Sequence, residues 1–296
     1  MSANSRISNA FKKAKVLPLH KDTKYILFSD CHRGDNSFAD DFAHNKKIYQ
    51  YALSKYLEQG FTYIELGDGD ELWENSFDKI FRANKEVFLT LKKFHDAKRL
   101  HFIWGNHDMV YKEEKNIQKN LYTYYDPVSE TDKALFPGIT FSEAIQLQYK
   151  EGKSFFLLHG HQADWFNYIC WKFSRFLVRI LWKPLQIIGI DDPTSPAQNF
   201  KELIKVERHI KAWILKNKNQ VLVTGHTHRP RFPEPKELPY FNTGSCVHPR
   251  CITGLEIENN TISLIKWHVV TTHEGTMQIK RTVLEGPQDI ALYFNA

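Results

Sequence analysis

The sequence predicts an α/β fold with mixed sheets and a helical insertion. Short apolar runs rich in β-branched and aromatic residues alternate with segments whose apolar residues recur at helical spacing. After Val223 the pattern changes to short strand-like runs separated by Gly, Asn and Pro, which is typical of antiparallel or mixed sheet. Residues 162–217 lack convincing strands and indicate two or three helices. We therefore expect one domain, residues 1–296, with 162–217 inserted as a helical cap.

These patterns predict the elements in chain order. Strands are predicted at 25–28, 61–66, 100–104, 154–158 and 221–223, with helices at 38–59 and 76–97 between the earlier ones. Later strand-like runs are PYFNTG, CITGLEIE, TISLIKWHVV and GTMQIKRTVL, all after residue 238. Alternation of strand and helix favours parallel pairing through crossovers, whereas closely spaced strands favour hairpins.

The composition is that of a globular protein with a basic balance of charge. Hydrophobic residues make up 42% and charged residues 25% of the 296 positions, unlike a disordered or fibrous chain. The formal charge of +6 favours anionic partners such as a phosphorylated substrate, an acidic membrane surface or nucleic acid. The opening does not resemble a secretory signal, apolar runs are interrupted by charge, and the cysteines lack CxxC spacing. We expect a cytoplasmic protein.

Polar clusters directly follow the first five strand-like runs. They are Ser29-Asp30-Cys31-His32, Gly67-Asp68-Gly69-Asp70-Glu71, Gly105-Asn106-His107-Asp108, His159-Gly160-His161 and Thr224-Gly225-His226-Thr227-His228. In an open α/β sheet the carboxyl ends of the strands form one rim, where ligands bind. The five loops are therefore expected to converge on one site.

The residue types in these clusters are those of a divalent-metal site. Asp and Asn offer oxygen and His offers imidazole nitrogen, which together suit borderline and hard cations. In Asp30-x-His32 and His226-x-His228, alternation along an extended segment would place both side chains of a pair on the same side. A lone Asp-x-His is most often an ordinary loop, but five compatible clusters after five strands predict a metal centre.

This ordered set of motifs resembles the calcineurin-like metallophosphoesterase superfamily, from about residue 25 to about residue 230. The resemblance implies a four-layer α-β-β-α sandwich of two mixed sheets, with two divalent metal ions at one rim. It implies that one metal is held by Asp30, His32, Asp68 and His228, and the other by Asp68, Asn106, His159 and His226, with Asp68 bridging. Manganese is expected, with iron or zinc as alternatives, because imidazole-rich sites favour these metals over magnesium.

The same resemblance implies a reaction. Two cations can share a hydroxide, bind phosphoryl oxygens and stabilise the charge of an in-line displacement. His107 would protonate or stabilise the departing oxygen, oriented by Glu71, with Asp108 as the alternative partner. Asn106 would also contact the substrate. Arg33 is a candidate phosphate clamp because a guanidinium can bind two oxygens, and an ordinary solvent-facing arginine is the alternative.

The segment after His159 is apolar and also carries a basic stripe. Lys172, Arg175, Arg179 and Lys183 are spaced so that they would share one face of a helix. A helix over 165–183 suits a substrate with acyl chains and phosphate, bound by Lys172, Arg175 and Arg179, or peripheral contact with an anionic membrane. The alternative is a helix packed on the core with a solvated basic face.

Two motifs are similar to those of the branch that contains UDP-2,3-diacylglucosamine pyrophosphatases. They are Gly67-Asp68-x-x-Glu71-x-Trp73 and Gly225-His226-Thr227-His228-Arg229-Pro230. That branch commonly has Arg in place of His107 and an acid in place of His161. We therefore predict a hydrolase of a phosphate ester or pyrophosphate that uses metal-activated hydroxide, with a lipid pyrophosphatase at the inner membrane face as the alternative. A nuclease is disfavoured because no extended basic tract with interleaved aromatics lies outside the insertion.

Overall fold

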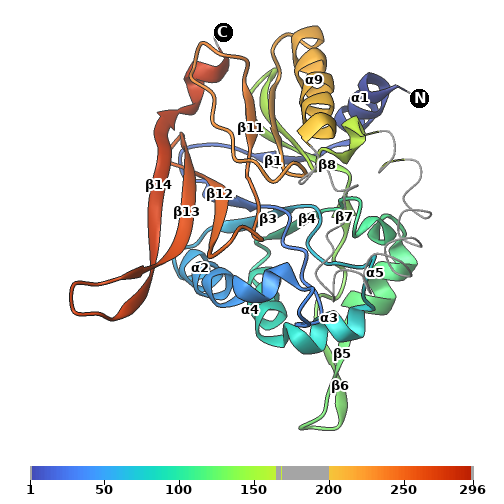
Figure 1. The fold of residues 1–296 in the computed structure, drawn as a ribbon. Helices are drawn as coiled ribbons and strands as arrows, with labels where there is room; N and C mark the ends of the chain where they lie inside the picture. The colour runs from blue at the N-terminus through green and yellow to red at the C-terminus, as the bar shows by residue number, and fades with distance from the viewer. Residues whose placement is uncertain (1, 165–167, 169–199, 295–296) are drawn as a thin grey trace.

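Two mixed β-sheets packed face to face form the centre of the molecule, with helices on both outer faces (Figure 1). The computed structural model describes residues 2–164, 168 and 200–294. Helices α1 (Ala3–Lys13) and α9 (Phe200–Lys216) lie over one sheet, and α2 (Lys46–Glu58) and α4 (Lys85–Asp96) lie over the other. The predicted four-layer α-β-β-α sandwich is thus confirmed.

The larger sheet has seven strands in the order β14-β13-β12-β2-β3-β4-β7. Their bounds are β2 Tyr25–Phe28, β3 Thr62–Leu66, β4 Leu100–Ile103, β7 Phe141–Ser142, β12 Cys251–Glu258, β13 Thr261–Thr271 and β14 Met277–Asp289. Strands β2, β3, β4 and β7 are parallel, as expected for strands joined by helical crossovers. Strands β12, β13 and β14 add to β2 in antiparallel fashion.

The smaller sheet has five strands in the order β1-β8-β9-β10-β11. Their bounds are β1 Lys15–Pro18, β8 Ala144–Lys150, β9 Lys153–Leu158, β10 Val221–Thr224 and β11 Tyr240–Asn242. Strands β9, β10 and β11 run parallel, so β9 and β10 end at the same edge. A separate hairpin, β5 (Thr123–Asp126) with β6 (Thr131–Ala134), projects from the helical side of the larger sheet (Figure 1).

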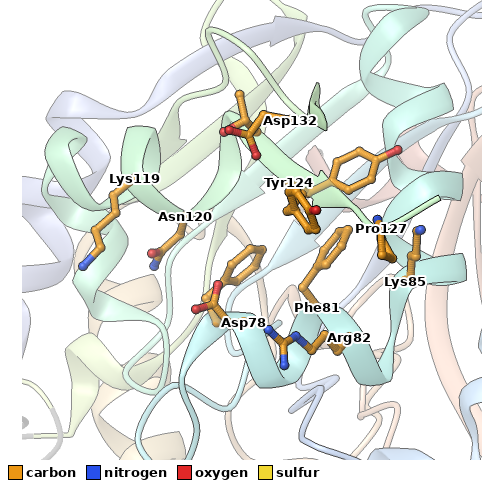
Figure 2. Close-up of a pocket in the computed structure, with 12 residues that line it drawn as sticks. Asp78, Phe81, Arg82, Lys85, Lys119, Asn120, Tyr124, Pro127 and Asp132 are labelled. Atoms are coloured by element: carbon orange, nitrogen blue, oxygen red, sulfur yellow. The ribbon is translucent and has the colours of Figure 1, made fainter. Parts of the chain in front are cut away.

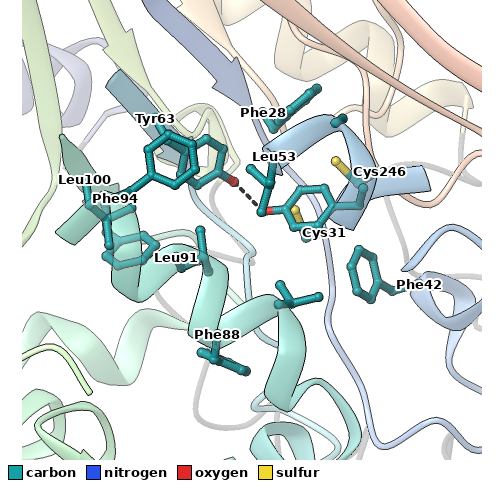
Figure 3. Packing of buried hydrophobic residues seen from close by; sticks show 14 of the residues in the cluster. Phe28, Cys31, Phe42, Leu53, Tyr63, Phe88, Leu91, Phe94, Leu100 and Cys246 are labelled. Carbon is teal, nitrogen blue, oxygen red and sulfur yellow. Dashed lines mark hydrogen bonds between the residues drawn. The ribbon is translucent and has the colours of Figure 1, made fainter. Parts of the chain in front are cut away.

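Three buried clusters separate the four layers. Leu27, Ile64 and Ile103 of the larger sheet pack against Leu147, Phe155 and Val223 of the smaller one. The outer face of the larger sheet packs on its helices, where Phe28 and Tyr63 lie near Leu53, Phe88 and Leu91 (Figure 3). The outer face of the smaller sheet packs Phe156 and Leu222 against Ile7 of α1 and Trp213 of α9. Strands buried on both faces explain why their sequences are continuously apolar.

Short helices shape the loops that leave the larger sheet. They are η1 Asp41–His44, α3 Phe77–Ala83, η2 Met109–Lys112 and α5 Glu114–Leu121. Two further short helices are η3 His161–Ala163, after β9, and η5 Ile290–Phe294, after β14. The helix predicted at 76–97 is split into α3 and α4 at Asn84. The Asn84 side-chain amide donates to the carbonyls of Ile80 and Gly34, which ties this break to the loop that follows β2.

Part of the predicted insertion is described. Within 162–217 the structure shows the end of η3 and all of α9, while most of the predicted 165–183 helix lies outside the described residues. Among the helices of the described residues, none has the length and apolar character needed to cross a membrane.

Candidate metal centre

The candidate ligands come from both sheets and meet at one rim of the sandwich. Their nitrogen and oxygen atoms lie within 4.8 Å of one another in three groups, which are Asp30 with His32 and His228, His32 with Asp68 and His107, and Asp68 with His159 and His226. The loops after β2, β3 and β4 of the larger sheet supply the ligands up to His107, and the loops after β9 and β10 of the smaller sheet supply His159, His226 and His228. The rim therefore belongs to two sheets, not to the single open sheet from which convergence was argued.

Backbone hydrogen bonds hold the loops after β2 and β3 together beyond the ends of the strands. The amides of Asp30, His32 and Arg33 donate to the carbonyls of Gly67, Asp68 and Gly69 at 3.1, 2.9 and 2.9 Å. The ladder thus continues as the strands leave the sheet. Three candidate ligands gain fixed relative positions from this pairing.

Left-handed backbone conformations set the direction of most ligand side chains. Asp30, His32, Asp68, His226 and His228 have φ of 51°, 46°, 51°, 66° and 55°. Such values are uncommon outside glycine and gather at functional sites, where surrounding structure maintains the strain. The prediction that Asp-x-His and His-x-His pairs are extended is therefore wrong. The paired side chains come together through this unusual backbone and not through strand alternation.

Asp68 lies between ligands of both predicted metals. Its Oδ2 is 3.1 Å from Nε2 of His159 and 3.8 Å from Nε2 of His32, while Oδ1 accepts the His107 amide at 2.8 Å. Burial would raise the pKa of Asp68, but the charges of His159 and His107 hold it well below its usual range. Asp68 is therefore an ionised, buried carboxylate in the position that a bridging ligand needs.

His159 is held by the backbone of the larger sheet. Its Nδ1 lies 2.7 Å from the carbonyl oxygen of Leu66, so Nδ1 carries the proton and Nε2 is left to bind. The neighbouring Gly67 has φ of +85°, and a Cβ there would lie 2.7 Å from Cγ of His159. Glycine at 67 is therefore required both by its backbone conformation and by the approach of the imidazole.

Four buried ligand atoms have no hydrogen-bond partner among the described residues. They are Nε2 of His32, His159 and His226 and Oδ1 of Asn106. Leaving a buried polar atom unpaired is costly, so such atoms require an explanation. Their grouping beside Asp30 and Asp68 fits divalent cations, which take imidazole nitrogen, amide oxygen and carboxylate oxygen together.

Glu71 joins a candidate ligand to the candidate acid. Its carboxylate lies 2.8 Å from Nδ1 of His32 and 2.7 Å from Nδ1 of His107. Asp108 instead accepts the backbone amides of Gly105 and Gly69. Between the two partners left open for His107, the structure thus places Glu71 against the ring.

The same contacts set the charge of His107. Burial lowers its pKa, but the charges of Glu71 and Asp68 outweigh burial and raise the pKa to about 10. The pKa of Glu71 is correspondingly lowered to about 2, because the two imidazoles overcome the effect of burial. In the protein without metal, His107 is therefore protonated near neutral pH, which is the form of a proton donor.

Arg33 is not placed to bind a phosphate, so this prediction is corrected. The residue is only 1% exposed. Its guanidinium makes two hydrogen bonds to Glu65, at 2.6 and 2.8 Å, and one from Nε to Asp70 at 2.7 Å. Its donors face carboxylates of the protein and not the rim. The solvent-facing alternative is also wrong, because Arg33 is a buried structural residue.

Other predicted residues fall beside or beyond the cluster. His161 is fully buried with its ring 5.4 Å from that of His159, and both its ring nitrogens lack hydrogen-bond partners among the described residues. Burial lowers its pKa well below the usual range. Lys172, Arg175 and Arg179 lie outside the described residues.

Sequence reasoning missed two side chains that contact the site. Trp73 stacks on the His107 ring, and Asp164 Oδ2 lies 3.7 Å from Nε2 of His226. Trp73 stands within a motif that was noted, but a motif does not reveal ring stacking. Asp164 follows the β9 cluster by several residues and carries no spacing signal.

A separate pocket of about 630 Å³ opens between α3, α5 and the β5–β6 hairpin (Figure 2). Phe81 and Tyr124 supply aromatic surface, and Arg82, Lys85 and Lys119 supply positive charge. The residues that line it do not include the candidate metal ligands. The pocket is therefore distinct from the rim site.

The comparisons with known proteins concern the same part of the chain. A model of the calcineurin-like phosphoesterase family matches residues 23–230, a range that contains every candidate ligand. Among solved structures, vacuolar protein sorting 29 from Cryptosporidium parvum is 14% identical, with coverage of 90% of this chain and 100% of that chain and a TM-score of 0.40. Vps29 from Chaetomium thermophilum is 10% identical, with coverage of 88% and 96% and a TM-score of 0.38. No curated protein sequence matches the chain.

Proposed function

The chain belongs to the calcineurin-like phosphoesterase family, and on that premise we propose that it hydrolyses phosphoesters with two divalent cations. The observation that carries the proposal is the convergence of nitrogen and oxygen ligand atoms from five loops at one rim. Several of these atoms are buried without hydrogen-bond partners in the described part of the chain. A folded protein that hydrolyses no phosphoester with any of these cations would instead be a binding protein that kept the fold.

The proposed ligand sets follow the family pattern. One cation would be held by Asp30, His32, Asp68 and His228, and the other by Asp68, Asn106, His159 and His226. When bound, the cations would activate a water for attack and offset charge on the phosphoryl oxygens. Manganese is our first choice and iron or zinc the alternatives, because the ligands are a mixture of imidazole and oxygen.

The protein's own residues would act on the leaving group and on orientation. His107 would give a proton to the departing oxygen, with Glu71 holding its Nδ1. Asn106, at the same loop, would contact the substrate as well as a cation. Hydrolysis would then yield a phosphate product and an alcohol, or two phosphates from a pyrophosphate.

The substrate class is the finer part of the proposal. The net charge of +6 favours a phosphorylated substrate, and two sequence motifs resemble those of UDP-2,3-diacylglucosamine pyrophosphatases, so a lipid-linked pyrophosphate is the alternative to a general phosphoester. Under that alternative the protein would be cytoplasmic and peripheral to the inner face of the membrane. Its 165–183 segment, with Lys172, Arg175 and Arg179, would contact the lipid. Nucleic acid is not an expected substrate.

A substrate panel with a His107→Ala variant tests the proposal. Manganese-dependent hydrolysis of an aryl phosphate monoester, an aryl diester and a UDP-linked diacyl sugar is measured for both proteins. Loss of a general acid removes a contribution on the order of 10²–10⁴ in rate. We therefore expect His107→Ala to lower kcat by this factor on the preferred substrate, with the greatest loss on the poorest leaving group.

His273→Ala provides the matched control, because His273 is exposed in the turn between β13 and β14. It should retain wild-type activity. Preference for the lipid nucleotide would support the lipid alternative, whereas equal or better turnover of the simple esters would support a general phosphoesterase. No metal-dependent turnover of any panel member would contradict the proposed function.

A further inference from the structure

Trp73 packs directly against the residue proposed to assist the leaving group. Its ring is stacked on His107, with ring centroids 4.1 Å apart and an angle of 20° between the planes. The indole N–H donates to the carbonyl oxygen of Asn106 at 2.7 Å. The side chain is only 4% exposed, so these contacts are shielded from water. One tryptophan thus holds both the ring of His107 and the backbone that carries it.

The other contacts of His107 leave one direction open. Glu71 occupies Nδ1, and the backbone N–H is bonded to Asp68. The His32 ring meets the His107 ring edge to face at 4.6 Å. With Nδ1 bonded to a carboxylate, the remaining nitrogen, Nε2, is the atom that can give a proton to a departing oxygen.

We infer that Trp73 is a positioning residue that fixes the plane of the His107 ring, so that Nε2 is aimed at the leaving group. This inference rests on the proposed function. A hydrogen bond at Nδ1 fixes one atom of the ring but allows rotation about the bond, whereas stacking fixes the plane. In the step concerned, Nε2–H gives its proton to the departing oxygen as the P–O bond breaks, and the imidazole is left neutral with Nδ1–H on Glu71.

The indole N–H also positions the loop that carries Asn106, a proposed metal ligand. Because it binds the Asn106 carbonyl, Trp73 keeps the loop that carries both a proposed metal ligand and the proposed acid in one position relative to β3. Displacement of a catalytic group by about 1 Å can lower a rate by about a hundredfold. Trp73 therefore contributes to catalysis without touching the reacting atoms.

The test compares Trp73→Leu, which removes the stacking, with Trp73→Phe, which keeps a smaller aromatic face and loses the N–H. Each is assayed with 4-nitrophenyl and unsubstituted phenyl esters of the class that the wild type hydrolyses. We expect Trp73→Leu to lower kcat about 10- to 100-fold on the phenyl ester, the usual cost of losing a supporting contact, and no more than about threefold on the nitrophenyl ester. Trp73→Phe should recover most of the loss, and KM should change little.

Trp267→Phe is the matched control, because Trp267 is also buried and its N–H donates to Tyr56 in the core at 3.1 Å. It should leave both activities unchanged. Manganese affinity, measured by calorimetry, should weaken to the same extent in Trp73→Leu and Trp73→Phe, because both lose the N–H that holds the Asn106 loop. Adding Trp73→Leu to His107→Ala should cause no further loss on the phenyl ester, because the two residues act through one ring.

The two proposals fail in different ways. If the wild type and the Trp267→Phe variant were both inactive, the proposed function and this inference would both be overturned. An active wild type whose Trp73 variants lose the same factor on both esters, or whose loss adds fully to that of His107→Ala, would overturn the inference alone. If Trp73→Leu does not fold, Trp73→Met, which also removes the aromatic face but fills the space with a flexible side chain, takes its place in the same comparison of two esters.

Discussion

Asp68→Asn is expected to lower kcat/KM for phosphoester hydrolysis by about a hundredfold to a thousandfold, as loss of one electrostatic stabiliser does in other enzymes. The substitution keeps the size of the side chain but removes the charge that lies between His159 and His32. Asparagine tolerates the left-handed backbone at this position, where φ is 51°, so the protein should remain folded. Steady-state kinetics with manganese, together with circular dichroism, measure both effects.

Asp22→Asn is the matched control, since the Asp22 side chain is 92% exposed and lies before β2, whereas Asp30 follows the other end of that strand. It should have wild-type activity. If Asp68→Asn retained activity within about threefold of the wild type, Asp68 would not be a bridging ligand and the two-cation account would be wrong.

Arg33→Met is expected to lower the free energy of unfolding by about 3–5 kcal/mol, the cost of removing one partner from a buried ion pair. Arg33 holds Glu65 and Asp70 with three hydrogen bonds in a site closed to water. Without the guanidinium, two carboxylates would remain buried with no cation against them in this network. Urea unfolding followed by tryptophan fluorescence measures the change.

Two further variants separate charge from packing in this network. Arg82→Met removes an exposed arginine from α3 and should change stability by no more than about 0.5 kcal/mol. Arg33→Met combined with Glu65→Gln and Asp70→Asn should recover part of the loss, because no unpaired charge is then buried. An Arg33→Met protein as stable as the wild type would show that the ion network contributes nothing to folding.

The strands that carry the site were predictable because they are short, apolar and buried on both faces. Runs at 25–28, 61–66, 100–104, 154–158 and 221–223 correspond to β2, β3, β4, β9 and β10 within one residue at each end. Three elements around the smaller sheet, β8, β1 and helix α1, were not predicted. Strand β8 alternates polar and apolar residues, β1 is exposed, and helix α1 has no long apolar run. Such elements take their stability from tertiary contacts that a local pattern does not contain.

The positions of the site residues followed from the strand ends, but their directions did not. Alternation assumes an extended backbone, and the left-handed conformations at Asp30 and His32 break that assumption. The prediction for Arg33 was wrong for a different reason, because its guanidinium is buried against Glu65 and Asp70. Stacking of Trp73 on His107 depends on two loops from different strands and has no local signal at all.

Titration of the metal-free protein with manganese by isothermal calorimetry is the most direct test of the central claim. The account predicts two ions bound per chain, with Asp68→Asn weakening both because that carboxylate is shared. Hydrolytic activity should rise as the two sites fill. A metal-free protein that binds no manganese, iron or zinc, or that binds one ion with unchanged affinity in Asp68→Asn, would contradict a bridged two-cation centre.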